Sequence, residues 1–428
     1  MSKNVEFEPF AERCCGLDVH KKAIVATVKG EGIARETKTF ESTTRSLTEL
    51  KEWLLELGVA HIAMESTSVY WKPVMNVLEP DGFSIMVVNA RHIKYVPGHK
   101  TDKKDSAWIC KLLRAGLLKG CLIPSREQRD LRDLTRYRRK LVQQQAAEHN
   151  RMIRVFEDAN LKLSSVFSDI RGKTCTAVID AVIACETDPK KLSELCTHWR
   201  LKSTQEEIAL AVEGNFTEHH IFMIRMIRRS IANIEAEIAD LDAEIDRRMA
   251  PIDDIIERLC GIPSMDRTSV KELIAEIGVD MEVFPTADHL ASWAGMSPSN
   301  NESADKKSSH TNHGNKATKA IMSECAWCAS RTKNTFFSTR YKRLAARRGK
   351  KRAIVALGRE ILIIVYHMLK DGTEYRELGP DYMDDRRKQA QIKYHKEHYS
   401  ERIRPSKRRR HSRHVSSGRF LLGRQARI

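Results

Sequence analysis

The stretch CCGLDVHKKAIVATV, residues 14–28, determines how the first part of the chain folds. Its apolar residues, above all those at 23–28, are suited to burial in a sheet. A second strand-like stretch, IARETKTF at residues 33–40, follows Gly30 and Gly32, two glycines that favour a tight turn. We therefore predict that the two stretches form an opening β-hairpin.

The next segment alternates between helical and strand-like patterns. We expect helices at residues 46–57, 69–78 and 102–115, and short apolar strands at residues 59–66 and 83–90. This alternation is typical of an α/β domain with a mixed sheet, which we assign to residues 1–125.

Four acidic residues fall where an α/β domain places its functional site. Asp18 lies in the first strand, and Glu65 ends a later strand. Asp102 and Asp105, at a helix start, project from one helix face, although either alone is more often a cap or a solvated charge. Four converging carboxylates need cations to neutralise them, and their hard oxygens suit Mg²⁺. We predict a site for two Mg²⁺ ions that supports phosphodiester cleavage.

After Pro124 the sequence changes to long polar segments with helical apolar spacing, and we assign residues 126–250 to a helical, coiled-coil segment. Within residues 222–249, apolar side chains recur at alternating steps of four and three, as in a coiled-coil seam. The seam positions are Ile227, Ile231, Ile234, Ile238, Leu241 and Ile245. The sequence leaves open whether this seam packs within its own chain or against a second copy, and we expect a dimer or tetramer.

Residues 251–380 are expected to form a second, mainly α-helical domain. In IERLCGIPSMDRTSVKELIAEIG, residues 256–278, Gly261 and Pro263 mark a turn between two helical patterns, and Gly278 ends the second. This pattern is similar to a helix-hairpin-helix, which can present backbone N–H groups to a DNA phosphate. An ordinary helical hairpin fits it equally well.

Between residues 291 and 326, a polar loop of Ser, Asn, Lys and Gly separates two helical patterns. A serine in this loop could attack phosphorus, but loops of this composition are usually solvated turns. Cys325 and Cys328 then form a lone CxxC in an apolar helical run. Because no second pair accompanies them, we expect core packing rather than zinc or redox chemistry.

The positive charge of the chain is concentrated at its C-terminal end. The net charge is +17, the pI is about 9.4, and residues 386–428 hold +13 of that charge. We interpret residues 381–428 as a disordered basic tail that binds nucleic acid without sequence preference. No apolar run suffices for a membrane span, no secretory signal is evident, and ten scattered cysteines fit a reducing compartment. We therefore expect a cytoplasmic protein without a membrane partner.

Six motifs follow one another along about residues 12–370: GLDVHKK, ESTSVYW, KTDKKDSAWI, GIPSMDRTSVKELIAEIG, FPTADHLASWAGMSPSNNESA and HGNKATKAIM. With these motifs in this order, the chain resembles transposases of the insertion sequence 110 family, which are recombinases guided by a structured RNA. The resemblance implies an RNase H-like (RuvC-like) N-terminal domain. There Asp18, Glu65, Asp102 and Asp105 take the places of the catalytic, metal-binding DEDD tetrad.

The same resemblance places Ser303 at the nucleophilic serine of a C-terminal transposase domain. It implies that Ser303 attacks a phosphodiester and forms a covalent phosphoserine–DNA intermediate, with Mg²⁺ at the tetrad. The tetrad and the serine of one active site are expected from different protomers. The implied partners are DNA, a structured guide RNA and further copies of the chain.

Two positions depart from the family pattern, where glycine is common. Ala304 follows the serine, and Ser68 follows the acidic residue of ESTSVYW. Alanine restricts the backbone more than glycine does, so Ser308 and Ser309 stay open as alternative nucleophiles.

Two further functions are compatible with the sequence. One is a metal-dependent nuclease, similar to Holliday-junction resolvases, that has no serine chemistry. The other is a nucleic-acid-binding protein without catalysis.

Overall fold

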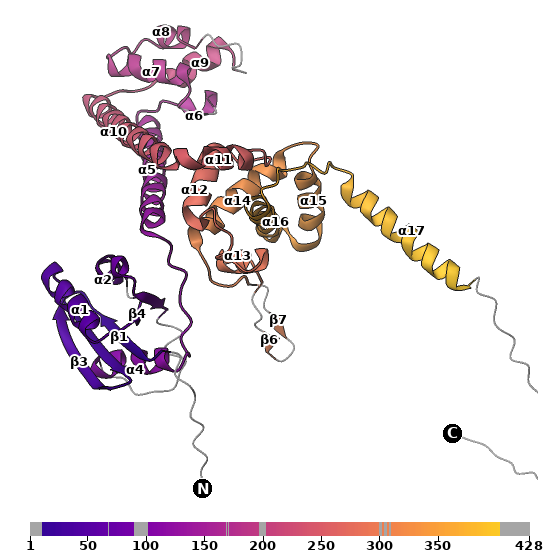
Figure 1. Ribbon diagram of the computed structural model, residues 1–428. Helices are drawn as coiled ribbons and strands as arrows, with labels where there is room; N and C mark the ends of the chain where they lie inside the picture. Colours follow the sequence, from indigo (N-terminus) through magenta and orange to yellow (C-terminus); the bar gives the residue numbers. More distant parts are fainter. Residues whose placement is uncertain are drawn as a thin grey trace, which may run out of the picture. The chain divides into compact units, whose positions relative to one another are not determined.

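The computed structural model shows two compact units, Met1–Arg248 and Met249–Ile428, which are described separately (Figure 1). The finer division into four segments stays a prediction. The structure describes residues 11–66, 68–89, 102–167, 169, 171–196, 203–298, 302–303, 306–307 and 310–402. The side chains of these residues are described except at 102–104, 302–303, 306–307, 387 and 394–402.

The first unit begins with a five-stranded mixed sheet of order β3-β2-β1-β4-β5. An antiparallel meander consists of β1 (Arg13–Val19), β2 (Ala23–Gly30) and β3 (Ile33–Glu41). Strands β4 (His61–Glu65) and β5 (Ser84–Val88) run parallel to β1. Helix α1 (Thr44–Glu56) leads from β3 to β4, and α2 (Trp71–Leu78) and η1 (Glu79–Asp81) lead from β4 to β5. This is an RNase H-like sheet, so the predicted fold class is confirmed.

The opening stretch contains one more reversal than its sequence indicates. The predicted hairpin between β2 and β3 is confirmed, and Gly32 takes a φ of 72° at its turn. Residues 14–28, however, form two antiparallel strands, because the chain turns at residues 20–22, where the N–H of His20 donates to the carbonyl of Ala23. The polar residues of this turn include no glycine or proline, so the sequence carries no strong turn signal here.

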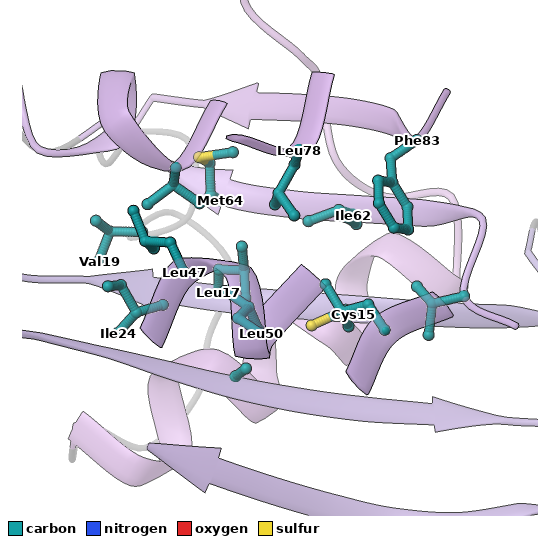
Figure 2. Close-up of a cluster of buried hydrophobic side chains, with 14 of the residues drawn as sticks. Cys15, Leu17, Val19, Ile24, Leu47, Leu50, Ile62, Met64, Leu78 and Phe83 are labelled. Atoms are coloured by element: carbon teal, nitrogen blue, oxygen red, sulfur yellow. The ribbon is translucent and has the colours of Figure 1, made fainter. Parts of the chain in front are cut away.

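The main core of this domain lies on the face of the sheet that α1 and α2 cover (Figure 2). The labelled side chains of this core are Cys15, Leu17, Val19, Ile24, Leu47, Leu50, Ile62, Met64, Leu78 and Phe83. Burial of each large apolar side chain contributes about 1.5–3 kcal/mol. Since side chains alternate along a strand, Gly16 and Asp18 of β1 face the other side of the sheet.

Helix α4 (Asp102–Arg114) packs on that other side. A smaller apolar cluster joins it to the sheet, formed by Ala11, Cys14, Ala63, Ile109, Cys110 and Leu113. The sheet is therefore covered on both faces, and α4 covers the face that carries Asp18.

Two long helices of the first unit, α5 (Arg126–Asp158) and α10 (Glu218–Met249), run antiparallel. Arg138 pairs with Asp242 (Nη2–Oδ2 3.1 Å), and Gln145 donates to Glu235 at 2.9 Å. Of the predicted seam, Ile227, Ile231 and Ile245 are buried within the chain, whereas Ile234, Ile238 and Leu241 are half-buried. The seam thus packs in its own chain, and oligomerisation through it stays a prediction.

Four short helices form a separate apolar cluster with one end of this pair. They are α6 (Leu163–Val166), α7 (Lys173–Ile183), α8 (Pro189–Glu194) and α9 (Gln205–Val212). Their buried side chains, such as Val178 and Ile208, pack with Phe156 of α5 and Ile224 of α10.

The second unit is mainly α-helical, as predicted. Its elements are η2 (Ala250–Ile252), α11 (Asp253–Cys260), α12 (Arg267–Ile277), α13 (Ala287–Trp293), β6 (Glu302–Ser303), β7 (Lys306–Lys307), α14 (Lys316–Arg331), α15 (Phe336–Arg348), α16 (Lys350–Asp371) and α17 (Tyr382–Arg402). The predicted helical hairpin is formed by α11 and α12, and Asp266 caps α12 by accepting from the N–H of Ser269 at 2.9 Å. Helix α16 packs against α13, α14 and α15.

The segment predicted as a disordered basic tail begins with a helix. Residues 382–402 form α17, and residues 403–428 lie outside the described part of the chain. The α17 sequence is rich in Arg, Lys, Gln and Glu, which have high helix propensity, and composition alone did not reveal this. Within the described residues, no helix combines the length and apolar character that a membrane crossing requires.

Candidate functional site

Two of the predicted acidic residues lie at the carboxyl ends of neighbouring parallel strands. Strands β1 and β4 pair in register up to Leu17 and Met64, so Asp18 and Glu65 come next along each strand. Leu17 and Met64 point into the main core. Strand alternation therefore directs Asp18 and Glu65 to the face that α4 covers, at adjacent positions.

Gly16 allows α4 to approach this face closely. A Cβ atom at Gly16 would lie 2.2 Å from the carbonyl oxygen of Ser106 and 2.4 Å from the backbone nitrogen of Cys110. The hydroxyl groups of Thr27 and Ser106 are hydrogen-bonded at 2.8 Å, which ties the first part of α4 to β2. The contact is thus between helix backbone and strand backbone, and only glycine fits at this point.

This approach brings the N-terminal part of α4 to the face that carries Asp18 and Glu65. Asp105 precedes Ser106 on α4 and is half-buried. Asp102 is the first residue of α4, and its side chain is outside the described set. Among described side chains, no group of three or more His, Cys, Asp or Glu residues is arranged to hold a metal ion. The complete tetrad therefore stays a prediction.

Asp18 is a buried carboxylate, with only 6% of the residue exposed. The Nε2 atom of His20 lies 3.1 Å from its Oδ2 atom. A buried carboxylate requires compensating polar or positive groups, and carboxylate oxygens are the ligands that divalent cations such as Mg²⁺ prefer. Asp18, Glu65 and Asp105 therefore offer the type of ligand atom that a divalent cation prefers, and their convergence on one cation stays a prediction.

The sequence interpretation assigned no role to His20. The spacing of two residues from Asp18 indicates a shared face only within a strand, and β1 ends at Val19, before His20. The turn that begins at His20 was the missing information.

Ser303 lies on a short antiparallel strand pair in the second unit, opposite Lys306. The structure describes the backbone of Ser303 but not its side chain, and Ala304, Ser308 and Ser309 lie outside the described residues. The identity of the nucleophile therefore stays a prediction.

The two chain segments that lead to β6 and away from β7 cross closely. A Cβ atom at Gly314 would lie 2.2 Å from the backbone nitrogen of Gly295. The N–H of Asn312 donates to the carbonyl of Ser297 at 3.0 Å, and an isolated antiparallel bridge joins Pro298 to Thr311. The loop that carries Ser303 therefore starts from a base that is fixed by backbone contacts.

A buried carboxylate beneath this base escaped the sequence interpretation. Glu276 of α12 is 1% exposed, and its Oε2 atom accepts a hydrogen bond from Nδ2 of Asn315 at 2.7 Å. Asn315 also caps α14, because its Oδ1 atom accepts from the N–H groups of Ala317 and Thr318. In the helical pattern, Glu276 looks like a solvated charge, so no sequence signal indicated its burial.

The CxxC pair is divided between core and surface. Cys325 is buried, and burial raises the pKa of its thiol to about 12. Cys328 is exposed, so the expected core packing is confirmed for Cys325 and wrong for Cys328. Because α14 is helical here, residues three apart diverge enough for one to reach solvent.

Comparisons with known proteins point to one family. Residues 15–160 match a family model of DEDD transposases of the IS110 group, described as transposase. Residues 256–342 match a second model, the transposase IS116/IS110/IS902 family. The two matches contain Asp18, Glu65, Asp102, Asp105 and Ser303.

Individual relatives agree with these matches. A probable family 20 transposase of Pseudomonas aeruginosa is 22% identical over 287 residues, which cover 66% of this chain and 73% of that protein. An uncharacterised 43.6 kDa protein of insertion element IS110 from Streptomyces coelicolor is 34% identical over 128 residues, 28% of this chain and 30% of that protein. Among solved structures, T. thermophilus RuvC in complex with a Holliday junction substrate matches 26% of this chain and 99% of its own, with 9% identity and a TM-score of 0.20.

Proposed function

The chain belongs to the insertion sequence 110 family of transposases, and on this premise we propose that it cuts and rejoins DNA at an active site with two parts. The first part is the acidic group of Asp18, Glu65, Asp102 and Asp105. The second is Ser303. The observation that carries the proposal is the adjacent placement of Asp18 and Glu65 on parallel strands, beneath the helix that bears Asp105.

The acidic group is proposed to hold divalent cations, most simply two Mg²⁺ ions. When bound, they would supply charge neutralisation at the attacking and leaving oxygens of a phosphodiester. Asp18 offers a buried, oriented carboxylate, and His20 at 3.1 Å helps to fix its orientation. Glu65 and Asp105 complete the oxygen-rich face from a second strand and from α4.

Ser303 is proposed as the nucleophile. Its hydroxyl oxygen forms a bond to phosphorus, the bond from phosphorus to one sugar oxygen breaks, and the proton lost by the serine is balanced by the proton that the departing sugar oxygen gains. The product is a phosphodiester between Ser303 and the DNA. Because one phosphodiester replaces another, this bond can later be exchanged for a bond to another DNA strand without a further energy source. The clamped base of the Ser303 loop supports this role, because a nucleophile must be positioned accurately.

The partners follow from the family. We propose that a structured RNA guides the choice of DNA ends and target, and that two or four copies assemble so that the acidic group of one copy meets Ser303 of another. The half-buried seam residues Ile234, Ile238 and Leu241 leave apolar surface for such an assembly.

A recombination assay tests the proposal. The full chain is co-expressed with its element, including the flanking noncoding DNA, and junction formation is measured by sequencing. We expect both Asp18→Asn and Ser303→Ala to abolish junctions, whereas Ser330→Ala, near the end of α14, keeps them, because among the described residues the Ser330 hydroxyl bonds only to the carbonyl of Trp327 in its own helix. Cleavage that survives Ser303→Ala would instead favour the metal-dependent nuclease without serine chemistry.

A further inference from the structure

A strongly basic segment of the second unit lies outside the proposed active site and before the C-terminal tail. Residues 331–352 contain ten Lys and Arg residues and no Asp or Glu. Acidic residues elsewhere in the first 385 residues compensate the positive charge of this segment, so the net charge of that region does not reveal it. A run of one sign over 22 residues differs from the mixed charges of an ordinary solvated helix face.

The fold concentrates half of these charges at one corner. Gly349 alone separates α15 from α16, with a φ of 82° that suits glycine. Consequently, the last turn of α15 adjoins the first turn of α16. We call the five residues at this junction the basic corner: Arg347, Arg348, Lys350, Lys351 and Arg352, all of which are exposed.

Most of the basic corner has no electrostatic partner among the residues that the structure describes. Two nearby arginines of α15 are used structurally, since Arg340 pairs with Glu360 and Arg343 with Asp384. By contrast, Arg347, Arg348, Lys350 and Lys351 form no ion pair or hydrogen bond in the described part of the chain. Such a cluster repels itself unless an anion binds.

The position of the cluster at a helix N-terminus adds a second unfavourable interaction to this repulsion. Lys350, Lys351 and Arg352 occupy the first turn of a 22-residue helix, where the helix dipole disfavours cations, and that turn has no acidic residue. The flanking helices are anchored, because Leu344, Ala353 and Leu357 are buried. The basic corner is therefore a fixed platform of charge and not part of a loose tail.

We propose that the basic corner binds the phosphodiester backbone of a nucleic-acid duplex. Exposed lysine and arginine side chains on a fixed platform contact phosphates and carry no base information, so the contact is independent of sequence. The inference rests on the proposed function for its biological context, because a transposase must hold duplexes while strands are exchanged. Duplex DNA and structured RNA both offer this chemistry.

Salt-dependent binding tests this proposal with the full chain. The variant Arg347→Gln, Arg348→Gln, Lys350→Gln, Lys351→Gln is compared with a control that removes four exposed cations of the first unit, Lys119, Lys140, Arg154 and Lys173, by the same change. The probes are a mixed-sequence 30-base-pair DNA duplex and an RNA hairpin. Affinity is measured between 50 and 300 mM KCl.

We expect the basic-corner variant to reduce the slope of log affinity against log salt by up to about 3.6 on DNA, since each of the four lost phosphate contacts removes about 0.9. Affinity should fall at least about tenfold at physiological salt, and the control should change the slope by less than about 1. If the variant loses affinity for only one of the two probes, that type of nucleic acid is the partner of the basic corner. An unchanged slope, or an equal fall in the control, overturns the proposal.

The outcome is separable from the proposed function. If recombination is absent but the basic-corner variant still reduces the slope, the binding surface stands and the recombinase proposal fails.

Discussion

The buried carboxylate of Glu276 accepts a hydrogen bond from the side-chain amide of Asn315 at 2.7 Å, which fixes how Asn315 is turned. With Nδ2 bound to Glu276, Oδ1 faces the start of α14 and caps it. The N–H of Asn315 donates to the carbonyl of Trp293, next to the glycine crossing below the Ser303 loop. One buried acid thus connects α12, α14 and the base of the loop.

Asn315→Ala should lower the local stability of α14 by more than the loss of a helix cap alone. It removes a helix cap, about 1 kcal/mol, and leaves a buried carboxylate short of a donor, about 1–3 kcal/mol more. Hydrogen exchange of the α14 amides should report a local opening free energy lower by about 2–4 kcal/mol. As a control, Thr43→Ala removes the exposed cap of α1 and should lower stability there by about 1 kcal/mol. Equal, small effects in both variants would contradict the role of Glu276.

Gly16→Ala should separate α4 from the sheet. The new Cβ atom would meet two backbone atoms within 2.4 Å, so we expect destabilisation of about 1–3 kcal/mol and loss of DNA cleavage. Gly32→Ala is the matched control, because its Cβ meets open space and only the positive φ is unfavourable, by about 1 kcal/mol. Thermal unfolding and a cleavage assay on cognate DNA measure both. Full cleavage by Gly16→Ala would show that the close approach of α4 is unnecessary.

Ser68→Gly should not destabilise the domain, although it removes a side chain. Ser68 has a φ of 50°, in the region that favours glycine, and it follows Glu65 by three residues. Relief of this strain, about 1–2 kcal/mol, is partly offset by the greater chain entropy of glycine. Ser68→Val, whose branched side chain is disfavoured at positive φ, should lower the unfolding midpoint. A midpoint for Ser68→Gly below that of Ser68→Val would refute this interpretation.

Alkylation should distinguish the two cysteines of the CxxC pair. Burial raises the pKa of Cys325 to about 12, so at pH 8 almost no thiolate is present, whereas Cys328 is exposed. Brief iodoacetamide treatment of the native protein should label Cys328 and leave Cys325 unlabelled by mass spectrometry. Raising the pH from 7 to 9 should still leave Cys325 unlabelled, because its pKa lies well above that range. Equal labelling of the two would indicate that α14 opens readily.

The sequence pattern predicted those parts of the fold that depend on local periodicity. Four strand-like stretches, the helix that begins at Asp102 and the helical hairpin at residues 256–278 follow from apolar spacing and from Gly and Pro positions. The turn at His20 was missed because a polar tripeptide without glycine makes it. The partner of the coiled-coil seam was left open because many helices offer an apolar face.

The candidate site was predictable to a similar extent. Asp18 and Glu65 end up adjacent because strand ends of parallel strands meet, which the alternating pattern implies. Glu276 could not be found, since burial of an acid depends on a partner, Asn315, that lies 39 residues away in sequence. The basic corner was missed because the net charge of long segments does not show local clusters. Its cations come together only because a single residue separates α15 from α16.

The covalent intermediate tests the central claim most directly. The full chain, with the RNA that co-purifies with it, is incubated with end-labelled DNA of its element and Mg²⁺, quenched in detergent and separated on a denaturing gel. We predict a labelled protein–DNA adduct whose phosphopeptide maps to Ser303, absent from Ser303→Ala and Asp18→Asn and kept in Ser308→Ala and Ser309→Ala. Cleaved DNA without any adduct, or an adduct that persists in Ser303→Ala, would contradict the account.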